Sequence, residues 1–64
     1  MEIKDFTKNI NKIVRYNDGR QNLDLILTAC ILRIYNNKFY YQAELTDKNN
    51  NSVVIVPLEK VEKV

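Results

Sequence analysis

Residues 31–45, ILRIYNNKFYYQAEL, contain the pattern that decides the fold of this chain. Asparagine tolerates the positive φ that a tight two-residue turn requires, so Asn36 and Asn37 mark a turn. The residues that follow, KFYYQAELT, include the aromatic and apolar residues typical of a strand. The stretch therefore predicts a β-hairpin with Asn36 and Asn37 at its turn.

A two-residue turn also predicts which residues of the two strands face each other. Tyr35 would face Lys38, and the pairs continue outward to Cys30 opposite Ala43. Strand alternation then sorts the side chains onto two faces. The almost wholly apolar face holds Thr28, Cys30, Leu32, Ile34, Phe39, Tyr41, Ala43 and Leu45. The mixed face holds Ala29, Ile31, Arg33, Tyr35, Lys38, Tyr40, Gln42 and Glu44, and Leu25 and Leu27 share its parity.

Residues 23–34, LDLILTACILRI, also match helical spacing, and a helix here is the main alternative. The consistent sorting of the hairpin favours a strand. After the polar loop 47–51, residues 52–58 (SVVIVPL) predict another strand. Its β-branched run ends at Pro57, because proline cannot donate a ladder hydrogen bond. We expect the apolar hairpin face to pack into the core against this strand, and residues 58–64 to form a turn and a short final strand.

The first segment has the period of an amphipathic helix, predicted over residues 2–15. Its apolar positions are Ile3, Phe6, Ile10, Ile13 and Val14. Residues 17–19, Asn-Asp-Gly, would supply the stop. Asp18-Gly19 is an alternative hairpin turn, but its flanks, VRYN and RQN, do not alternate, so we favour the helix stop.

Length and composition limit the function classes. Residues 1–64 are expected to form a single domain that buries only about 60% of its unfolded surface, so self-association is a plausible aid to stability. The lone Cys30 allows no intramolecular disulfide, and no residue cluster suggests a metal or cofactor. There is no histidine, Gly19 is the only glycine, and Cys30 should lie inert beside Ala43, which predicts a protein that is not an enzyme.

The chain lacks the apolar segment of a signal peptide or a membrane span, so we expect a cytoplasmic protein without membrane contact. Two surfaces are candidates for binding. The first is the mixed hairpin face, where tyrosine and arginine are typical of protein interfaces. Its candidate partner-binding residues are Ile31, Arg33, Tyr35, Tyr40 and Gln42. The helix could cover this face, or it could bind a partner protein, a second copy or unpaired bases.

The second candidate surface is a basic stripe on the expected helix. Its residues are Lys4, Lys8, Lys12 and Arg15, opposite the apolar positions. Such a stripe could contact nucleic-acid phosphates. The favoured interpretation is the solvated outer face that every amphipathic helix needs, and Asp5 beside the stripe weakens its field.

The ending VPLEKVEKV, residues 56–64, resembles that of small SH3-like barrels, in which a strand ending in Val-Pro precedes one helical turn and a last short strand. The acidic, aromatic-rich loop and the tryptophan of peptide-binding SH3 domains are absent, so no proline-rich peptide site is implied. FYYQAELTDKNNNSVVIVPLEKV also resembles small uncharacterised proteins of bacterial mobile elements.

We therefore expect a mostly β (α+β) fold, with an N-terminal amphipathic helix on a curved antiparallel sheet that is SH3-like in its second half. The expected function is that of a small non-enzymatic protein-interaction module, with a homodimer as one form. The alternative is a nucleic-acid-binding accessory or regulatory factor of a phage or mobile element.

Overall fold

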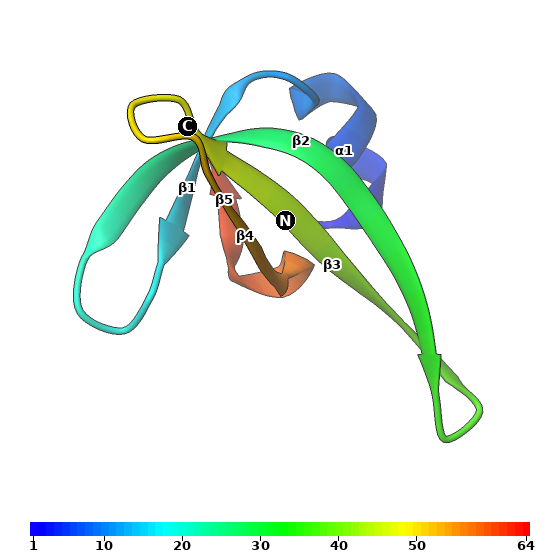
Figure 1. Cartoon of the computed structure of the whole chain (residues 1–64). Helices are drawn as coiled ribbons and strands as arrows, with labels where there is room; N and C mark the ends of the chain where they lie inside the picture. Colours follow the sequence, from blue (N-terminus) through cyan, green and yellow to red (C-terminus); the bar gives the residue numbers. More distant parts are fainter.

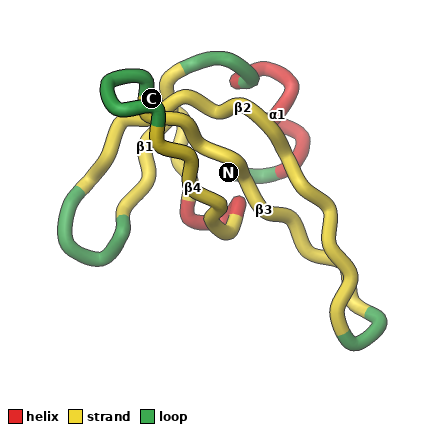
Figure 2. The backbone as a smooth tube through the Cα atoms, viewed as in Figure 1, coloured by secondary structure: helices red, strands yellow, loops and turns green.

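The computed structural model describes residues 1–64 and is built mainly of strands (Figures 1 and 2). Its elements are α1 (Ile3–Asn9), β1 (Ile13–Asn17), β2 (Asn22–Tyr35), β3 (Lys38–Asp47), β4 (Ser52–Pro57), the 3₁₀ turn η1 (Leu58–Lys60) and β5 (Val61–Lys63). The strands form one antiparallel sheet in the order β4-β3-β2-β1-β5. The predicted mostly β fold with one N-terminal helix is confirmed.

The central hairpin has the predicted register. Tyr35 pairs with Lys38, and all the predicted pairs follow as far as Cys30 and Ala43. Asn36 and Asn37 have φ values of 50° and 62°, the positive values that a hairpin turn of this type requires. Residues 23–34 are strand, so the helical alternative is wrong.

A β-bulge at Thr28 interrupts this regular pairing. The register of β2 against β3 shifts between Leu27 and Ala29, which leaves Thr28 without a partner in the ladder. The Thr28 hydroxyl lies 3.1 Å from the main-chain oxygen of Glu44 and 2.9 Å from its carboxylate Oε2. It also lies 3.1 Å from Oγ1 of Thr46. These contacts hold the extra residue on the same side of the sheet as Glu44.

The bulge reverses the side-chain alternation of β2. Leu25 and Leu27 are buried in the core, whereas unbroken alternation placed them with the mixed face. Thr28, which was expected on the apolar face, instead bonds to residues of the opposite face. The predicted face assignment is therefore wrong before Ala29 and correct after it, because one extra residue moves every preceding side chain to the other face.

The N-terminal helix is shorter than predicted. It ends at Asn9, and Asn11 takes a positive φ of 63° before the chain enters β1. Strand β1 pairs with β2 on one side and β5 on the other, so Val14 is fully buried as a strand residue. The predicted helix over residues 2–15 is wrong in its second half, since two ladders of hydrogen bonds outweigh a weak helical period.

Asp18 and Gly19 lie in the loop that joins β1 to β2, so the rejected hairpin alternative was the correct one. Gly19 has φ of 94°, a value that favours glycine. The Asp18 carboxylate accepts hydrogen bonds from the amides of Gln21 and Arg20, at 2.9 and 2.8 Å. These two bonds lower the pKa of Asp18 below its usual value.

The core is a single cluster of eight buried apolar side chains. They are Val14, Leu25, Leu27, Ala43, Leu45, Val56, Leu58 and Val61. Phe6 and Ile10 from the helical segment pack against this cluster, which places α1 over the core.

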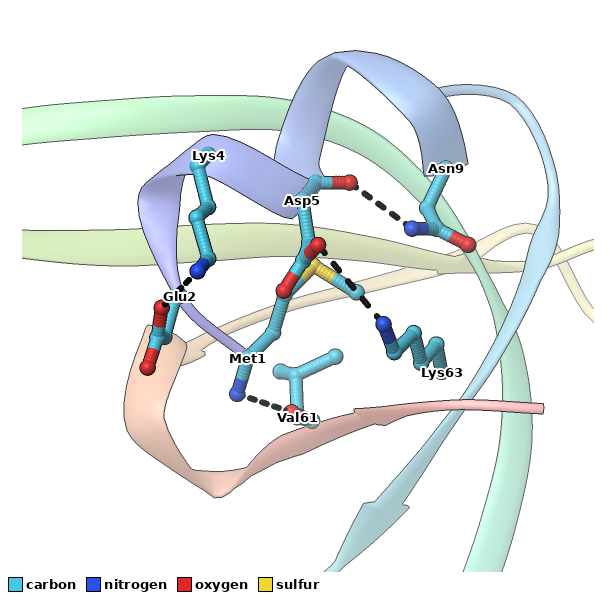
Figure 3. A network of polar contacts seen from close by, with 7 residues as sticks. All are labelled: Met1, Glu2, Lys4, Asp5, Asn9, Val61 and Lys63. Atoms are coloured by element: carbon cyan, nitrogen blue, oxygen red, sulfur yellow. Dashed lines mark hydrogen bonds and ion pairs between the residues drawn. The ribbon is translucent and has the colours of Figure 1, made fainter.

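Polar contacts join the start of the chain to β5 (Figure 3). The amino group of Met1 donates to the carbonyl oxygens of Leu58, at 3.1 Å, and Val61. The Lys63 ammonium lies 3.6 Å from the carboxylate of Asp5 on α1. The helix, η1 and β5 therefore form one corner of the molecule.

Candidate interaction site on the hairpin arm

The distal half of the β2–β3 hairpin, residues 31–42, is here called the hairpin arm. Strand β1 pairs with β2 only up to Ile26, and β4 pairs with β3 only from Gln42 onward. Beyond these points the two strands have only each other as partners, and they extend away from the rest of the chain (Figure 1). Because no other strand pairs with the arm beyond Gln42 and most of its side chains are exposed, both of its faces are candidates for contact with another molecule.

One face of the arm, the apolar arm face, consists of two cross-strand pairs. These are Leu32 with Tyr41 and Ile34 with Phe39. The sequence predicted these side chains in the core, but they are 54%, 40%, 65% and 67% exposed, so that prediction is wrong. The reason is a mismatch in length, since β2 and β3 have 14 and 10 residues, whereas β1 and β4 beside them have five and six. Comparison of the predicted strand lengths was the signal that could have revealed this exposed face.

The opposite face, the mixed arm face, brings together the residues predicted to bind a partner. They are Ile31, Arg33, Tyr35, Tyr40 and Gln42, joined by Lys38 in three successive cross-strand pairs. Arg33, Tyr35 and Tyr40 are exposed, so α1 does not cover them. Ile31 and Gln42 are half-buried at the base of the arm. Arg33 pairs directly with Tyr40, and its Nε donates a hydrogen bond to Oε1 of Gln42.

The arm has an uneven distribution of charge. Arg33 and Lys38 are its only ionisable residues apart from tyrosine, because no carboxylate occurs between Asp24 and Glu44. Both cations belong to the mixed arm face, whereas the apolar arm face has no charge at all. The arm therefore offers an apolar surface on one side and a basic, aromatic surface on the other.

A groove of about 660 Å³ lies at the base of the arm. It is lined by Met1, Glu2, Ile3, Tyr40, Tyr41, Pro57, Leu58 and Glu59. Tyr41 of the apolar arm face and Tyr40 of the mixed arm face both line the groove, so it adjoins both faces of the arm. Glu59 is exposed and takes part in no ion pair. The Glu2 carboxylate does form one, because its Oε2 lies 3.3 Å from Nζ of Lys4. The groove is thus mainly apolar and carries carboxylates on its border.

The predicted basic stripe does not form on one helix. Lys4 and Lys8 lie on α1, but Lys12 follows the end of the helix and Arg15 is on β1. Lys4 forms the contact with Glu2 described above (Figure 3), and Arg15 bonds to Asp24 at 3.1 Å. Lys8 and Lys12 are exposed and have no ion-pair partner.

Few residues are arranged for covalent or metal chemistry. No group of three or more histidine, cysteine, aspartate or glutamate side chains is placed to hold a metal ion. Cys30 pairs with Ala43 as predicted, but it is half-buried rather than fully buried. Partial burial raises the pKa of its thiol, which disfavours the reactive thiolate.

The chain matches no protein-family model, no curated protein and no solved structure. None of its helical segments has the length and apolar character needed to cross a membrane. The functional argument therefore depends on the geometry of the arm and of the groove at its base.

Proposed function

We propose that this chain is a small, non-enzymatic protein-interaction module that binds a partner protein through the hairpin arm. The observation that carries the proposal is the apolar arm face, where four large side chains are exposed by 40–67% on a stretch in which β2 and β3 pair only with each other. Contiguous apolar patches of a few hundred Å² on a small protein commonly mark interaction sites.

The stability of the arm supports the same function. A two-stranded hairpin is marginally stable in water unless a further layer covers one of its faces. Exposed side chains of this size present roughly 450 Å² of apolar surface, whose burial is worth on the order of 10 kcal/mol before the costs of association. A partner that covers Ile34 and Phe39 would therefore stabilise the arm and gain affinity from the same contact.

The mixed arm face supplies a different kind of contact. Tyr35 is 69% exposed and Tyr40 is 42% exposed, and tyrosine and arginine contribute much of the binding energy at many interfaces. Arg33 is held by Gln42, so its guanidinium is oriented before a partner arrives. In this proposal Ile31, Tyr35 and Tyr40 add contact area, and Arg33 adds orientation.

Site-specific photo-crosslinking in cells tests the proposal. A photoreactive phenylalanine derivative at position 39 is expected to give a discrete protein adduct that disappears when Ile34→Asp is added. The same derivative at position 20, in the exposed β1–β2 loop, is the matched control and should give no such adduct. Equal adducts from both positions, or none from position 39, would contradict an interaction function for the arm.

A second candidate is a nucleic-acid-binding accessory or regulatory factor of a phage or mobile element. Its support is the exposed, unpaired state of Lys8 and Lys12 together with the cations Arg33 and Lys38 on the arm. Phosphate contacts are strongest at low salt, so filter binding near 50 mM salt tests this function. Retention that falls on Lys8→Glu with Lys12→Glu would support it, and no retention of single- or double-stranded nucleic acid would exclude it.

An SH3-like architecture is part of the proposal. Its support is the order of the strands, the single turn η1 directly after Pro57, and the return of the short β5 to a place beside β1. In this architecture the arm is an elongated version of the hairpin formed by the second and third strands. A binding site on this hairpin is therefore a different kind of site from one formed by the loops between strands.

A further inference from the structure

We infer that the mixed arm face binds single-stranded nucleic acid. Two tyrosines, Tyr35 and Tyr40, stack on unpaired bases, and two cations, Arg33 and Lys38, contact the phosphates. The inference rests on the second candidate function, because it assigns that function a site and a form of nucleic acid. The apolar arm face, on the other side of the same two strands, stays free for a partner protein.

Rings and cations alternate on the mixed arm face. Next to the turn, Tyr35 pairs with Lys38 across the ladder. One step further along the same face, Arg33 pairs with Tyr40. Paired side chains lie about 5 Å apart and successive ones on a strand about 7 Å apart, so each ring has one cation across the ladder and another along its own strand. A nucleotide offers a flat base and a phosphate, and this face has a partner for each of them twice.

Both rings are accessible. Tyr35 and Tyr40 are exposed on neighbouring strands. Aromatic side chains on an open sheet surface stack on bases without regard to sequence, and sheets that bind RNA in this way stack about two or three bases. The bases of a duplex are already stacked on one another, so only unpaired bases can use these rings.

The charge near the turn fits a phosphate backbone. Neither Arg33 nor Lys38 takes part in an ion pair, and the arm contains no carboxylate. The nearest carboxylate along this face is that of Glu44, four residues or about 13 Å along β3 from Tyr40, where it accepts a hydrogen bond from Thr28. The carboxylates of the groove also lie at the base of the arm. The nucleic acid is therefore expected to cross the face near the turn.

Arg33 is oriented for an oxyanion before a ligand arrives. Its Nε donates to Oε1 of Gln42, which uses one of the five N–H donors of the guanidinium. The two terminal amino groups remain for a phosphate, a group that arginine binds through paired hydrogen bonds. Because the side chain is already restricted, less conformational entropy is lost on binding.

The apolar arm face disfavours a duplex as the ligand. A two-stranded ribbon fits the major groove of duplex DNA, which has phosphates along both of its walls. Insertion there would bring Leu32, Ile34 and Phe39 against charged groups for which they have no polar partner. A single strand laid along the mixed arm face avoids this contact. An acidic peptide would satisfy the two cations alone, whereas a nucleotide also uses the two rings beside them.

Fluorescence anisotropy of a labelled oligothymidylate tests the inference. Near 50 mM salt we expect a dissociation constant of about 10–100 µM, and binding to a duplex of the same length at least about 10-fold weaker. Tyr35→Ser should weaken binding to the single strand about 10-fold, and Tyr35→Phe, which keeps the ring, should retain the affinity. An equally tight duplex, or displacement of the oligothymidylate by oligoglutamate at equal concentration, would overturn the inference.

Phe39→Ser is the matched control for the stacking contact. Phe39 is nearly as exposed as Tyr35, at 67% against 69%, but it belongs to the apolar arm face. Its replacement should leave the affinity for oligothymidylate unchanged. Equal losses from Phe39→Ser and Tyr35→Ser would show that the mixed arm face is not the site.

The salt dependence of binding tests the phosphate contact. Each phosphate contact with a single strand contributes about 0.7 to the slope of log affinity against log salt concentration, so Lys38→Gln should reduce that slope by about 0.7. Lys8→Gln is the matched control, because Lys8 is also exposed and unpaired but lies on α1. A slope reduced by Lys8→Gln and not by Lys38→Gln would overturn the placement of the site on the arm.

The outcomes separate this inference from the functions proposed above. Binding that is lost on Lys8→Glu with Lys12→Glu, and that Tyr35→Ser does not affect, would overturn the inference and leave a nucleic-acid function standing. No binding of oligothymidylate near 50 mM salt would overturn the inference, and no binding of the duplex either would also overturn the second candidate function. Crosslinking from position 39 tests the interaction function of the apolar arm face separately.

Discussion

Thr28 determines which side chains of β2 reach the core. It is the extra residue of the bulge, and its position on the outer side of the sheet allows both Leu27 and Cys30 to face inward. The half-buried hydroxyl has Glu44 and Thr46 as partners, so no polar atom is left unsatisfied there. A polar residue in an otherwise apolar strand segment is thus stabilised by the bulge that it forms.

We expect Thr28→Val to destabilise the fold by about 1–2 kcal/mol. The substitution keeps the size of the side chain but removes the hydroxyl from Glu44 and Thr46. Thr28→Ser retains the hydroxyl and should cost less than half as much. Urea unfolding followed by circular dichroism measures both variants, and equal destabilisation by valine and serine would show that the hydroxyl contacts contribute nothing.

At the scale of elements, strand length separates the core from the hairpin arm. The part of the central hairpin that lies beside β1 and β4 contains the buried Leu27, Ala43 and Leu45. The part beyond them has the same alternation and an equally apolar face, yet it remains exposed. Burial therefore depends on the neighbouring strands, and these end before the hairpin does.

This difference predicts unequal effects of mutation on stability. Leu45→Ala should cost about 2–5 kcal/mol, because Leu45 is fully buried and a cavity would remain. Ile34→Ser and Phe39→Ser should each change the free energy of unfolding by no more than about 0.5 kcal/mol in dilute protein. Thermal or urea unfolding in dilute protein provides the measurement. A loss at position 34 or 39 as large as that of Leu45→Ala would mean that the arm belongs to the core.

The first segment shows how an element changes type under tertiary contacts. Its apolar residues fit a helix, but a helix of seven residues is weak without packing. Residues 13–17 instead gain two strand partners, β2 and β5. Val14 is buried in either form, so its apolar character predicted burial correctly and could not distinguish a helix from a strand.

For the whole molecule, the short β5 completes the sheet by pairing with β1. Val61 is fully buried and pairs with Tyr16, and its carbonyl accepts a hydrogen bond from the amino group of Met1. Only eight of the 64 residues are buried, so the loss of one of them removes a large share of the core. The two ends of the chain are therefore stabilised by the same few contacts.

Truncation after Lys60 should abolish cooperative unfolding. It removes Val61 and the hydrogen-bond ladder between β1 and β5. Strand β1, which contains Val14, then pairs with β2 alone in place of two strands. Removal of Val64 alone is the control, because that residue is 75% exposed and lies outside β5. The spread of proton NMR chemical shifts and the width of the thermal unfolding transition distinguish the two truncations. A sharp transition in the chain that ends at Lys60 would show that β5 is dispensable.

The mixed arm face was found from the sequence because a two-residue turn and strand alternation are sufficient to place Arg33 opposite Tyr40. The apolar arm face was missed as a site, since its composition is that of a core strand. Only the short reach of β1 and β4 leaves it open. The basic stripe was lost because it required a helix that continued past Asn9.

The sequence by itself determined the turn at Asn36 and Asn37, the register of the central hairpin, and the ending in which η1 and β5 follow Pro57. These features depend on backbone preferences of a few adjacent residues, which local sequence expresses directly. The tertiary structure alone decided the bulge at Thr28, the conversion of residues 13–17 into a strand, and the exposure of the arm. Each of these depends on which distant segments cover or pair with a residue, and that competition involves the whole chain.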